Sequence, residues 1–324
     1  MFVVLTVDVE PSIAGAISDP VVNAPLLHEP VWGEVEGRSE GLGFMLRTLG
    51  QHDLKSTFFV ETAHVHRFSQ TDMGGYVEKI LDARQDVQMH LHPVWANFRN
   101  GAVRPKKTFS DRCDLIARED LSEMIEHGIE QLRRWGVQNP TGLRTGNFSV
   151  GKNVYGAMRA AGLSYSSNIC IGTSKSEGLD YSGGVYDIDG IVEIPMTCFE
   201  DKGPIGQGKL RPLQVTSCSF LEIKTALTDL YEAGCKIAVV LTHPFEFLKR
   251  DDFRFSNMRA NSLVQARFDR LCGFLAENRA RFETVTLEEA AISLKGPYVA
   301  PTPEGRAVYS LFRSAQNFLN DRFF

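Results

Sequence analysis

Residues 2–10 read Phe2-Val-Val-Leu-Thr-Val-Asp8-Val-Glu10, a short apolar run that ends in two carboxylates. Similar runs recur along the chain, and amphipathic segments with helical spacing separate them. We predict strands at residues 2–7, 56–60, 87–91, 142–144, 191–195 and 237–242. Because strands that alternate with helices form parallel sheets, this order predicts an α/β fold, either a barrel or an open sheet.

The segments between these strands carry apolar residues on one helical face. We predict helices at residues 121–135, 150–161, 220–231 and 264–275, and a further one at 304–320. Asp120 and Glu123 have the spacing of a capping box at the start of the first, and Ser219 and Glu222 have it at the start of the third. Long irregular stretches at 11–41, 96–117 and 201–216 interrupt the pattern, and loops of that length are often functional.

Composition excludes several classes of protein. The chain has 324 residues, 43% hydrophobic and 23% charged, which is ordinary for a soluble globular protein. The net charge of −5, without a run rich in Lys or Arg, argues against nucleic-acid binding. No apolar stretch reaches the roughly 20 residues of a membrane span. The N-terminus lacks a basic flank and the six cysteines form no CxxC pair, so we expect a cytoplasmic protein with reduced thiols.

The C-terminal segment is expected to stand apart from the rest. We divide the chain into one domain at residues 1–294 and a helical appendage at residues 295–324. The appendage carries apolar residues at helical spacing, namely Val308, Leu311, Phe312, Ala315, Phe318 and Leu319. This pattern predicts a helix that packs on its own domain or, alternatively, forms a contact in a homo-oligomer.

Polar residues gather at the ends of the predicted strands. They are Asp8, Glu10, His90, His92, Arg144 and His243. Because parallel α/β folds place active sites at the carboxyl ends of strands, these side chains should converge on one face.

Side chains two residues apart on an extended segment point the same way, so His90 and His92 can face one ion. Two imidazoles with a carboxylate form a common ligand set for zinc or a similar divalent metal. A second His-x-His, His64-Val-His66, also follows a strand and is the alternative pair. We prefer His90 and His92 because Pro93 and Trp95 follow them.

Each of these residues also has a structural interpretation. A single histidine at a strand end before proline, such as His243, is more often a hydrogen-bonded structural residue, and Asp8 alone could be a helix or turn cap. The substrate-binding candidates are Trp32, Trp95, Asn147 and Phe148. The aromatic rings among them can cover the flat face of a sugar, or they can belong to the core.

Five short motifs, taken in order, resemble the polysaccharide deacetylase family, whose metal-dependent enzymes remove acetyl groups from N-acetylated sugars. They are Leu5-Thr-Val-Asp8-Val-Glu10, Lys55-Ser-Thr-Phe-Phe-Val60, His92-Pro93, Arg144-Thr-Gly-Asn-Phe148 and Leu241-Thr-His243. The order and spacing agree from residue 1 to about residue 290. The resemblance implies a distorted (β/α) barrel of about seven parallel strands.

The resemblance also implies a role for each residue at the strand ends. Asp8 would be the general base, Arg144 would orient Asp8, and His243 would be the general acid. A divalent metal, with zinc the expected ion, would be held by Glu10, His90 and His92.

This sequence departs from the family pattern at two of these positions. The family's metal-binding Asp directly follows the base, whereas Val9 stands there and Glu10 must take the role. The family's two histidines are four residues apart, whereas Gln88 stands four before His92, so His90 must serve. No clear motif orients His243, and Asp187 and Asp189 are the candidates.

The function implied is that of a metal-dependent hydrolase that removes the acetyl group from an N-acetylated sugar or oligosaccharide. The expected cytoplasmic location favours a role in surface-polysaccharide biosynthesis. One alternative is a hydrolase of a small linear or cyclic amide. Another is a catalytically silent carbohydrate-binding scaffold, against which the presence of Asp8, Arg144 and His243 together argues. We also expect the loop around residues 32–40 to lie over the metal and shape the pocket.

Overall fold

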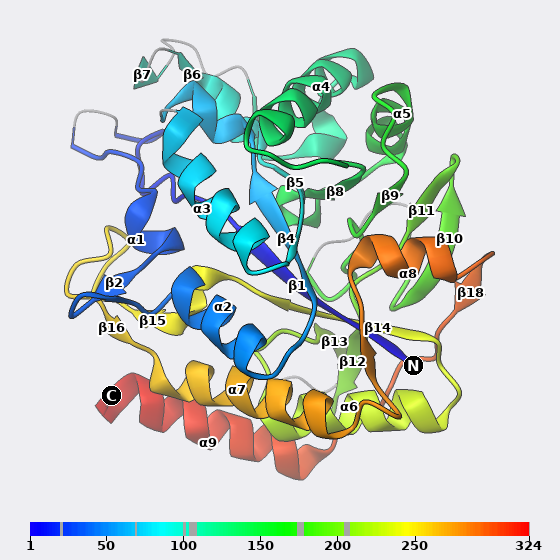
Figure 1. Cartoon of the computed structure of the whole chain (residues 1–324). Coiled ribbons are helices and arrows are strands. Elements are labelled where there is room, and N and C mark those ends of the chain that lie inside the picture. Colours follow the sequence, from blue (N-terminus) through cyan, green and yellow to red (C-terminus); the bar gives the residue numbers. More distant parts are fainter. Residues whose placement is uncertain are drawn as a thin grey trace.

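The structure is a computed structural model that describes residues 1–19, 22–68, 70–99, 102–103, 109–173, 178–203 and 208–323. Within these ranges ten strands form one curled sheet (Figure 1). Seven of them are parallel neighbours, in the order β14 (Ile237–Thr242), β1 (Phe2–Val9), β4 (Ser56–Glu61), β5 (Asp86–Leu91), β8 (Gly142–Thr145), β9 (Tyr165–Ser166) and β11 (Ile191–Glu193).

The sheet continues beyond β11 with antiparallel strands. β10 (Gly184–Ile188) pairs with β11, β18 (Tyr298–Val299) pairs with β10, and β17 (Glu283–Thr284) adds to β1 in parallel. Because β14 and β18 end the hydrogen-bonded path, the sheet is a half-barrel and not a closed ring. The predicted distorted barrel of about seven parallel strands is confirmed.

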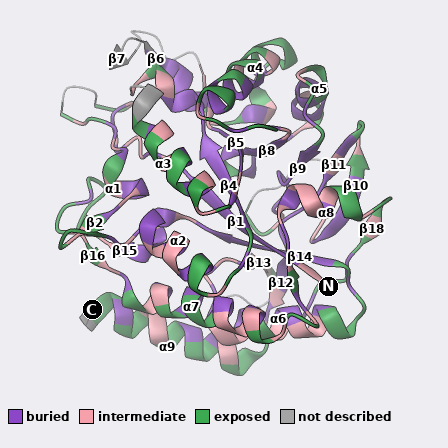
Figure 2. Ribbon diagram, in the orientation of Figure 1, coloured by how far each residue is buried: buried purple, intermediate pink, exposed green. Residues whose placement is uncertain are grey.

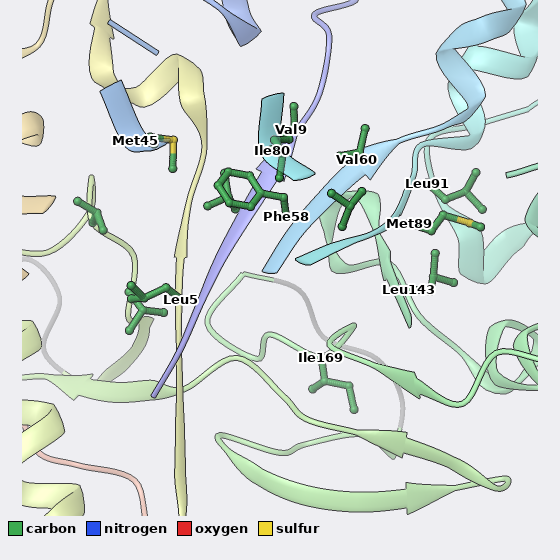
Figure 3. Close-up of a cluster of buried hydrophobic side chains, with 14 of the residues drawn as sticks. Leu5, Val9, Met45, Phe58, Val60, Ile80, Met89, Leu91, Leu143 and Ile169 are labelled. Carbon is green, nitrogen blue, oxygen red and sulfur yellow. The ribbon is translucent and has the colours of Figure 1, made fainter. Parts of the chain in front are cut away.

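The central strands are buried along almost their whole length because both of their faces are covered. All six residues of β4 and of β14 are buried, which is typical of strands in a parallel sheet. Figure 3 shows one of the clusters that cover the sheet, in which Leu5, Phe58 and Met89 from three neighbouring strands lie together. Met45 of α2 (Leu42–Gln51) and Ile80 of α3 (Gln70–Asp82) belong to the same cluster.

The predicted helices are present with shifted ends. They are α4 (Arg118–Arg134), α5 (Lys152–Ala160), α6 (Phe220–Glu232), α7 (Ser262–Glu277) and α9 (Ala307–Phe323), and the sequence analysis did not predict α1 (His28–Val31), α2, α3 or α8 (Leu287–Ser293). The capping box of Ser219 and Glu222 is confirmed. The one predicted for Asp120 and Glu123 is wrong, because the helix already begins at Arg118 and Asp120 lies within its first turn.

Short β-hairpins and 3₁₀ turns lie outside the main sheet. The hairpins pair β2 (Glu34–Val35) with β3 (Arg38–Ser39), β6 (Phe98–Arg99) with β7 (Ala102–Val103), β12 (Cys198–Asp201) with β13 (Lys209–Pro212), and β15 (Leu248–Lys249) with β16 (Arg259–Ala260). Short 3₁₀ turns follow four of the parallel strands, at η1 (Ala63–His66), η2 (Pro93–Asn97), η4 (Gly146–Phe148) and η5 (Pro244–Phe247). These turns hold the loops that carry the candidate site.

The C-terminal segment contacts the rest of the chain along its described length. β18 extends the sheet, and α9 runs along α6 and α7 (Figure 1). All six cysteines are buried, and none forms a disulfide. No helix in the described ranges combines the length and the apolar character needed to cross a membrane.

Candidate active site

The parallel register brings the predicted polar residues to one rim of the sheet. His90 on β5 pairs in register with Arg144 on β8 and with Glu61 on β4. Asp8 lies near the end of β1, and His243 directly follows β14, which is the other neighbour of β1. Consecutive strands of the half-barrel therefore deliver one polar group each to the same edge.

Arg144 is fully buried and its hydrogen bonds hold it in one orientation. Its Nη1 donates to Asp8 Oδ1 at 2.8 Å and to Thr6 Oγ1 at 2.9 Å. Its Nε and Nη2 donate to the carbonyl and hydroxyl oxygens of Ser167. The guanidinium also lies over the Phe59 ring, 4.4 Å from its centroid. A guanidinium held in this way fixes the Asp8 carboxylate in turn.

The second oxygen of Asp8 faces His243. Asp8 Oδ2 lies 3.8 Å from His243 Nε2, beyond hydrogen-bond distance. His243 Nδ1 lies 2.9 Å from Glu246 Oε1, and Glu246 Oε2 accepts a hydrogen bond from Thr242 Oγ1 at 2.9 Å. Burial disfavours the charged ring, but the Glu246 carboxylate outweighs it and raises the pKa of His243 to about 9. The ring is therefore a proton donor over most of the neutral range.

The candidates Asp187 and Asp189 for orienting His243 are wrong. Asp187 accepts a hydrogen bond from the Gly190 backbone, and Asp189 forms an ion pair with Arg159. Glu246 takes this position because η5 turns the chain back directly after Pro244. The spacing of Glu246 three residues after His243, across a proline turn, is the sequence signal that could have identified it.

Glu10, His90 and His92 come together as the predicted metal group. Glu10 Oε2 lies 2.6 Å from His92 Nε2 and 3.2 Å from His90 Nε2. One ligand atom from each of the three lies within 4.8 Å of the others. Burial opposes ionisation of Glu10, but the adjacent His92 and His90 outweigh it and lower the pKa of Glu10 well below its usual value.

Two further carboxylates, neither of them among the residues predicted from the sequence, support this group. Asp111 lies 2.9 Å from His92 Nδ1 and also accepts a hydrogen bond from Asn147 Nδ2. Glu61, at the end of β4, accepts hydrogen bonds from the backbone N–H groups of His92 and Ala63. Glu61 could have been found as a carboxylate at a strand end, whereas Asp111 lies in an irregular segment without any pattern.

The residues present fit a divalent metal. Two imidazole Nε2 atoms and one carboxylate oxygen face a common point, which is a ligand set that zinc and related ions accept with positions left open. A carboxylate on the far nitrogen of His92 is the arrangement that fixes the tautomer of a metal-binding histidine. His90 Nδ1 is buried and has no hydrogen-bond partner in the part of the chain that the structure describes.

The alternative pair occupies a different environment. His64 is buried in η1, where its ring stacks on Trp135 and its Nδ1 lies 2.7 Å from the Glu61 carbonyl oxygen. Burial lowers the pKa of His64 to about 4. Among the described residues, the only group of three or more His, Cys, Asp or Glu with converging ligand atoms is Glu10, His90 and His92, so His64 and His66 are outside it.

An open pocket of about 240 Å³ adjoins the metal group. It is lined by Glu10, Pro11, Ser12, Ile13, Pro30, His92, Val94, Trp95, Asp111, Phe245, Arg250 and Phe255. The first loop therefore lies at this rim as expected, but through Pro11–Ile13 and Pro30. The stretch expected to cover the metal, residues 32–40, contributes no side chain to that lining.

The four predicted substrate-binding residues lie at different depths. Trp95 lines the pocket but is buried against Phe98. Phe148 is buried beside the Arg144 guanidinium. Asn147 is exposed, and its side-chain amide donates a hydrogen bond to Asp111. Trp32 stacks on Tyr76, outside the pocket lining.

Comparison with known structures confirms the predicted fold. A protein from Mycobacterium smegmatis assigned as a polysaccharide deacetylase superimposes with a TM-score of 0.56 at 16% identity, covering 93% of this chain and 94% of that one. A family 4 carbohydrate esterase from Streptomyces lividans, in complex with acetate, gives 0.44 at 13%, covering 93% and 97%. A CE4 family pseudoenzyme from Bacillus anthracis gives 0.46 at 12%, covering 94% and 69%.

No protein-family model matches the chain, and no curated protein matches it. The resemblance to the polysaccharide deacetylases therefore holds at the level of the fold, over nearly the whole chain.

Proposed function

We propose that this chain is a metal-dependent hydrolase that removes the acetyl group from an N-acetylated sugar or oligosaccharide. One observation carries the proposal. An arginine-held carboxylate (Asp8) and a carboxylate-held imidazole (His243) lie 3.8 Å apart at the rim of the sheet. The metal-binding group of Glu10, His90 and His92 lies at the same rim and borders the pocket through Glu10 and His92. Amide hydrolysis needs a base, an acid and an electrophile, and these three groups supply them.

Asp8 takes the role of general base. A water molecule attacks the acetyl carbonyl carbon and transfers its proton to Asp8 Oδ2, while Oδ1 stays bonded to Arg144. Because Arg144 is itself held by Thr6 and Ser167, Asp8 needs no reorganisation during the reaction. A bound divalent metal supplies Lewis-acid polarisation of the acetyl oxygen.

His243 takes the role of general acid. Its Nε2 lies 3.8 Å from Asp8 Oδ2 and donates a proton to the nitrogen as the carbon–nitrogen bond breaks. The products are acetate and a free amine. Glu246 holds the ring by Nδ1, so that Nε2 is directed toward the substrate, and keeps the ring protonated at neutral pH.

The pocket lining supports a sugar as substrate. Phe245 and Phe255 offer aromatic faces, and Arg250 lies over the Phe255 ring at 4.0 Å. Such a wall combines apolar contact with hydrogen-bond donors, as a hydroxyl-rich ring requires. We place the reaction in the cytoplasm, in the biosynthesis of a surface polysaccharide, and take zinc as the metal.

The test is acetate release from chitooligosaccharides by the purified, metal-loaded chain. We expect turnover in the wild type, and loss of both bound metal and activity in His90→Ala and His92→Ala. The matched control is His127→Ala, an exposed histidine on α4, which should retain both. Turnover of small linear or cyclic amides alone would favour the amidase alternative. A metal-loaded wild type that releases no acetate from any amide would favour the scaffold.

A further inference from the structure

The C-terminal helix α9 is attached to the molecule through its polar side. Arg313, which is 6% exposed, pairs with Asp201 at 2.8 Å and with Glu222. Ser310 also bonds the Arg313 guanidinium, at 2.8 Å. Further along α9, Gln316 and Asn317 accept hydrogen bonds from Arg267 of α7. Ion pairs and side-chain hydrogen bonds therefore attach this side of the helix to the rest of the molecule.

The opposite side of α9 is apolar and turned to solvent. Its large residues have exposed fractions of 64%, 55%, 46%, 58% and 50% at Val308, Leu311, Phe312, Phe318 and Leu319, respectively. The only charged side chain between Ala307 and Asn320 is the buried Arg313. Figure 2 shows this helix at the edge of the molecule, with exposed residues along it. We call these five residues, with Ala315, the α9 face.

A surface helix normally turns its apolar stripe toward its own core. Here the orientation is the reverse, and buried ion pairs enforce it. Contiguous exposed apolar surface of this kind marks an interaction site in a soluble protein. A groove of about 280 Å³, which includes Leu263 of α7 and Leu319, extends the α9 face toward its neighbour.

We propose that the α9 face is the interface of a homodimer, in which α9 packs antiparallel against α9 of a second copy. The apolar positions follow the spacing i, i+3, i+4, i+7, i+10 and i+11, which is the pattern of a helix that packs on another helix. A two-fold axis between residues 313 and 314 would place Val308 opposite the partner subunit's Leu319. The same axis would place Phe312 opposite the partner subunit's Ala315, so that a large side chain meets a small one.

Charge favours the same antiparallel pairing. Exposed Glu304 precedes the N-terminus of α9, and exposed Arg322 lies near its C-terminus, where it borders the face beside Phe318. An antiparallel pair brings each acid toward the other copy's base. A helix that binds a membrane surface instead carries several Lys or Arg residues along its polar side, whereas the only basic residues of α9 are the buried Arg313 and Arg322 near its C-terminus.

The area is sufficient for a specific dimer. Five large side chains that are about half exposed leave on the order of 100 Å² each, so pairing two faces removes roughly 1,000 Å² from water, the size at which specific interfaces begin.

The experiment is the molar mass of the full chain in solution, by light scattering after gel filtration over a range of concentrations. We expect twice the chain mass for the wild type and a single chain mass for Leu311→Glu and for Phe318→Glu. Ile292→Glu, at an equally exposed apolar residue on α8, is the matched control and should remain dimeric. Because the ion pairs of Arg313 are untouched, the monomeric variants should keep the melting temperature of the chain within a few degrees.

Charge exchange tests the orientation. Arg322→Glu should raise the dimer dissociation constant several-fold, and adding Glu304→Arg to it should restore the wild-type value. A wild type that stays monomeric at high concentration would overturn the proposal, as would a dimer that survives both glutamate substitutions. Co-sedimentation of a monomeric wild type with phosphatidylglycerol vesicles would assign the face to lipid instead.

Discussion

The molecule contains two buried clusters in which an arginine pairs with carboxylates. They differ in whether every carboxylate oxygen accepts a hydrogen bond. In the cluster under α9, Asp201 and Glu222 flank Arg313, and each of their four carboxylate oxygens accepts hydrogen bonds. In the cluster at the rim of the sheet, Arg144 donates to Oδ1 of Asp8, whereas Oδ2 lies 3.8 Å from His243 Nε2, beyond hydrogen-bond distance.

The difference separates a structural cluster from a reactive one. A buried charge network is tolerated when every member is satisfied, and an incompletely bonded one is costly. We attribute the difference to function, because Oδ2 of Asp8 is the oxygen that receives the proton of the attacking water in the proposed reaction. The cluster under α9 has no such oxygen and anchors a helix.

The largest expected effect is on catalysis at Asp8. Asp8→Asn should lower acetate release by about 10²–10⁴-fold, the usual contribution of a positioned proton-transfer group. Metal content, measured by elemental analysis, should stay at the wild-type level. Asp201→Asn, the matched change in the other cluster, should leave the rate per folded molecule unchanged. Equal loss of activity in both variants would show that the two clusters do not differ in this way.

The next effect is on stability, at Arg313. Arg313→Met leaves Glu222 buried without its counter-charge and leaves Asp201 with Arg211 alone. It should lower the free energy of unfolding by about 3–5 kcal/mol. Urea denaturation followed by circular dichroism measures this. Arg306→Met, which removes a more exposed arginine paired with Asp229, should cost no more than about 1 kcal/mol. Similar losses in the two variants would contradict the anchoring role.

The metal group should respond to its outer carboxylate. Asp111→Asn keeps a hydrogen-bonding group beside His92 but removes the charge, and should weaken metal binding by about 10–100-fold. Calorimetric titration with Zn²⁺ measures the dissociation constant. Asp114→Asn is the control, because Asp114 pairs with Arg112 and not with a member of the metal group. Unchanged affinity in Asp111→Asn would place Asp111 outside the metal site.

The smallest effect is a change of pH profile at Glu246. His243 acts in its protonated form and has a pKa of about 9, so the rate should fall only as the pH rises through about 9. Glu246→Gln removes the carboxylate, and the fall should begin closer to the ordinary histidine pKa of about 6.5. The variant should therefore lose about tenfold or more at pH 8 and little at pH 6. If the rate of Glu246→Gln falls at the same pH as that of the wild type, Glu246 does not raise the pKa of His243.

Regular patterns made much of the fold predictable. The run Ile237–Thr242 was predicted with its observed bounds, because a strand buried on both faces is apolar at most of its positions. β9 and β10 were missed because the first has two residues and the second alternates less clearly between apolar and polar positions.

The rim of the site was also visible in the sequence, because strand ends are regular positions. Asp8, Glu10, His90, His92, Arg144 and His243 all occupy such ends, and parallel register brings them together. Their supporting groups were not visible in the same way. Asp111 reaches His92 from an irregular segment, and only the folded loop determines that distance.

The sequence by itself determined six of the seven parallel strands, the order of their polar ends and the existence of the last helix, because these depend on local periodicity and on chain order. Only the tertiary structure decided which residues complete the site and which way α9 faces. An amphipathic pattern cannot show which side is turned inward when buried partners for its polar side come from elsewhere in the chain. Here Asp201 and Glu222, far away in sequence, hold Arg313 and turn the apolar side of α9 outward.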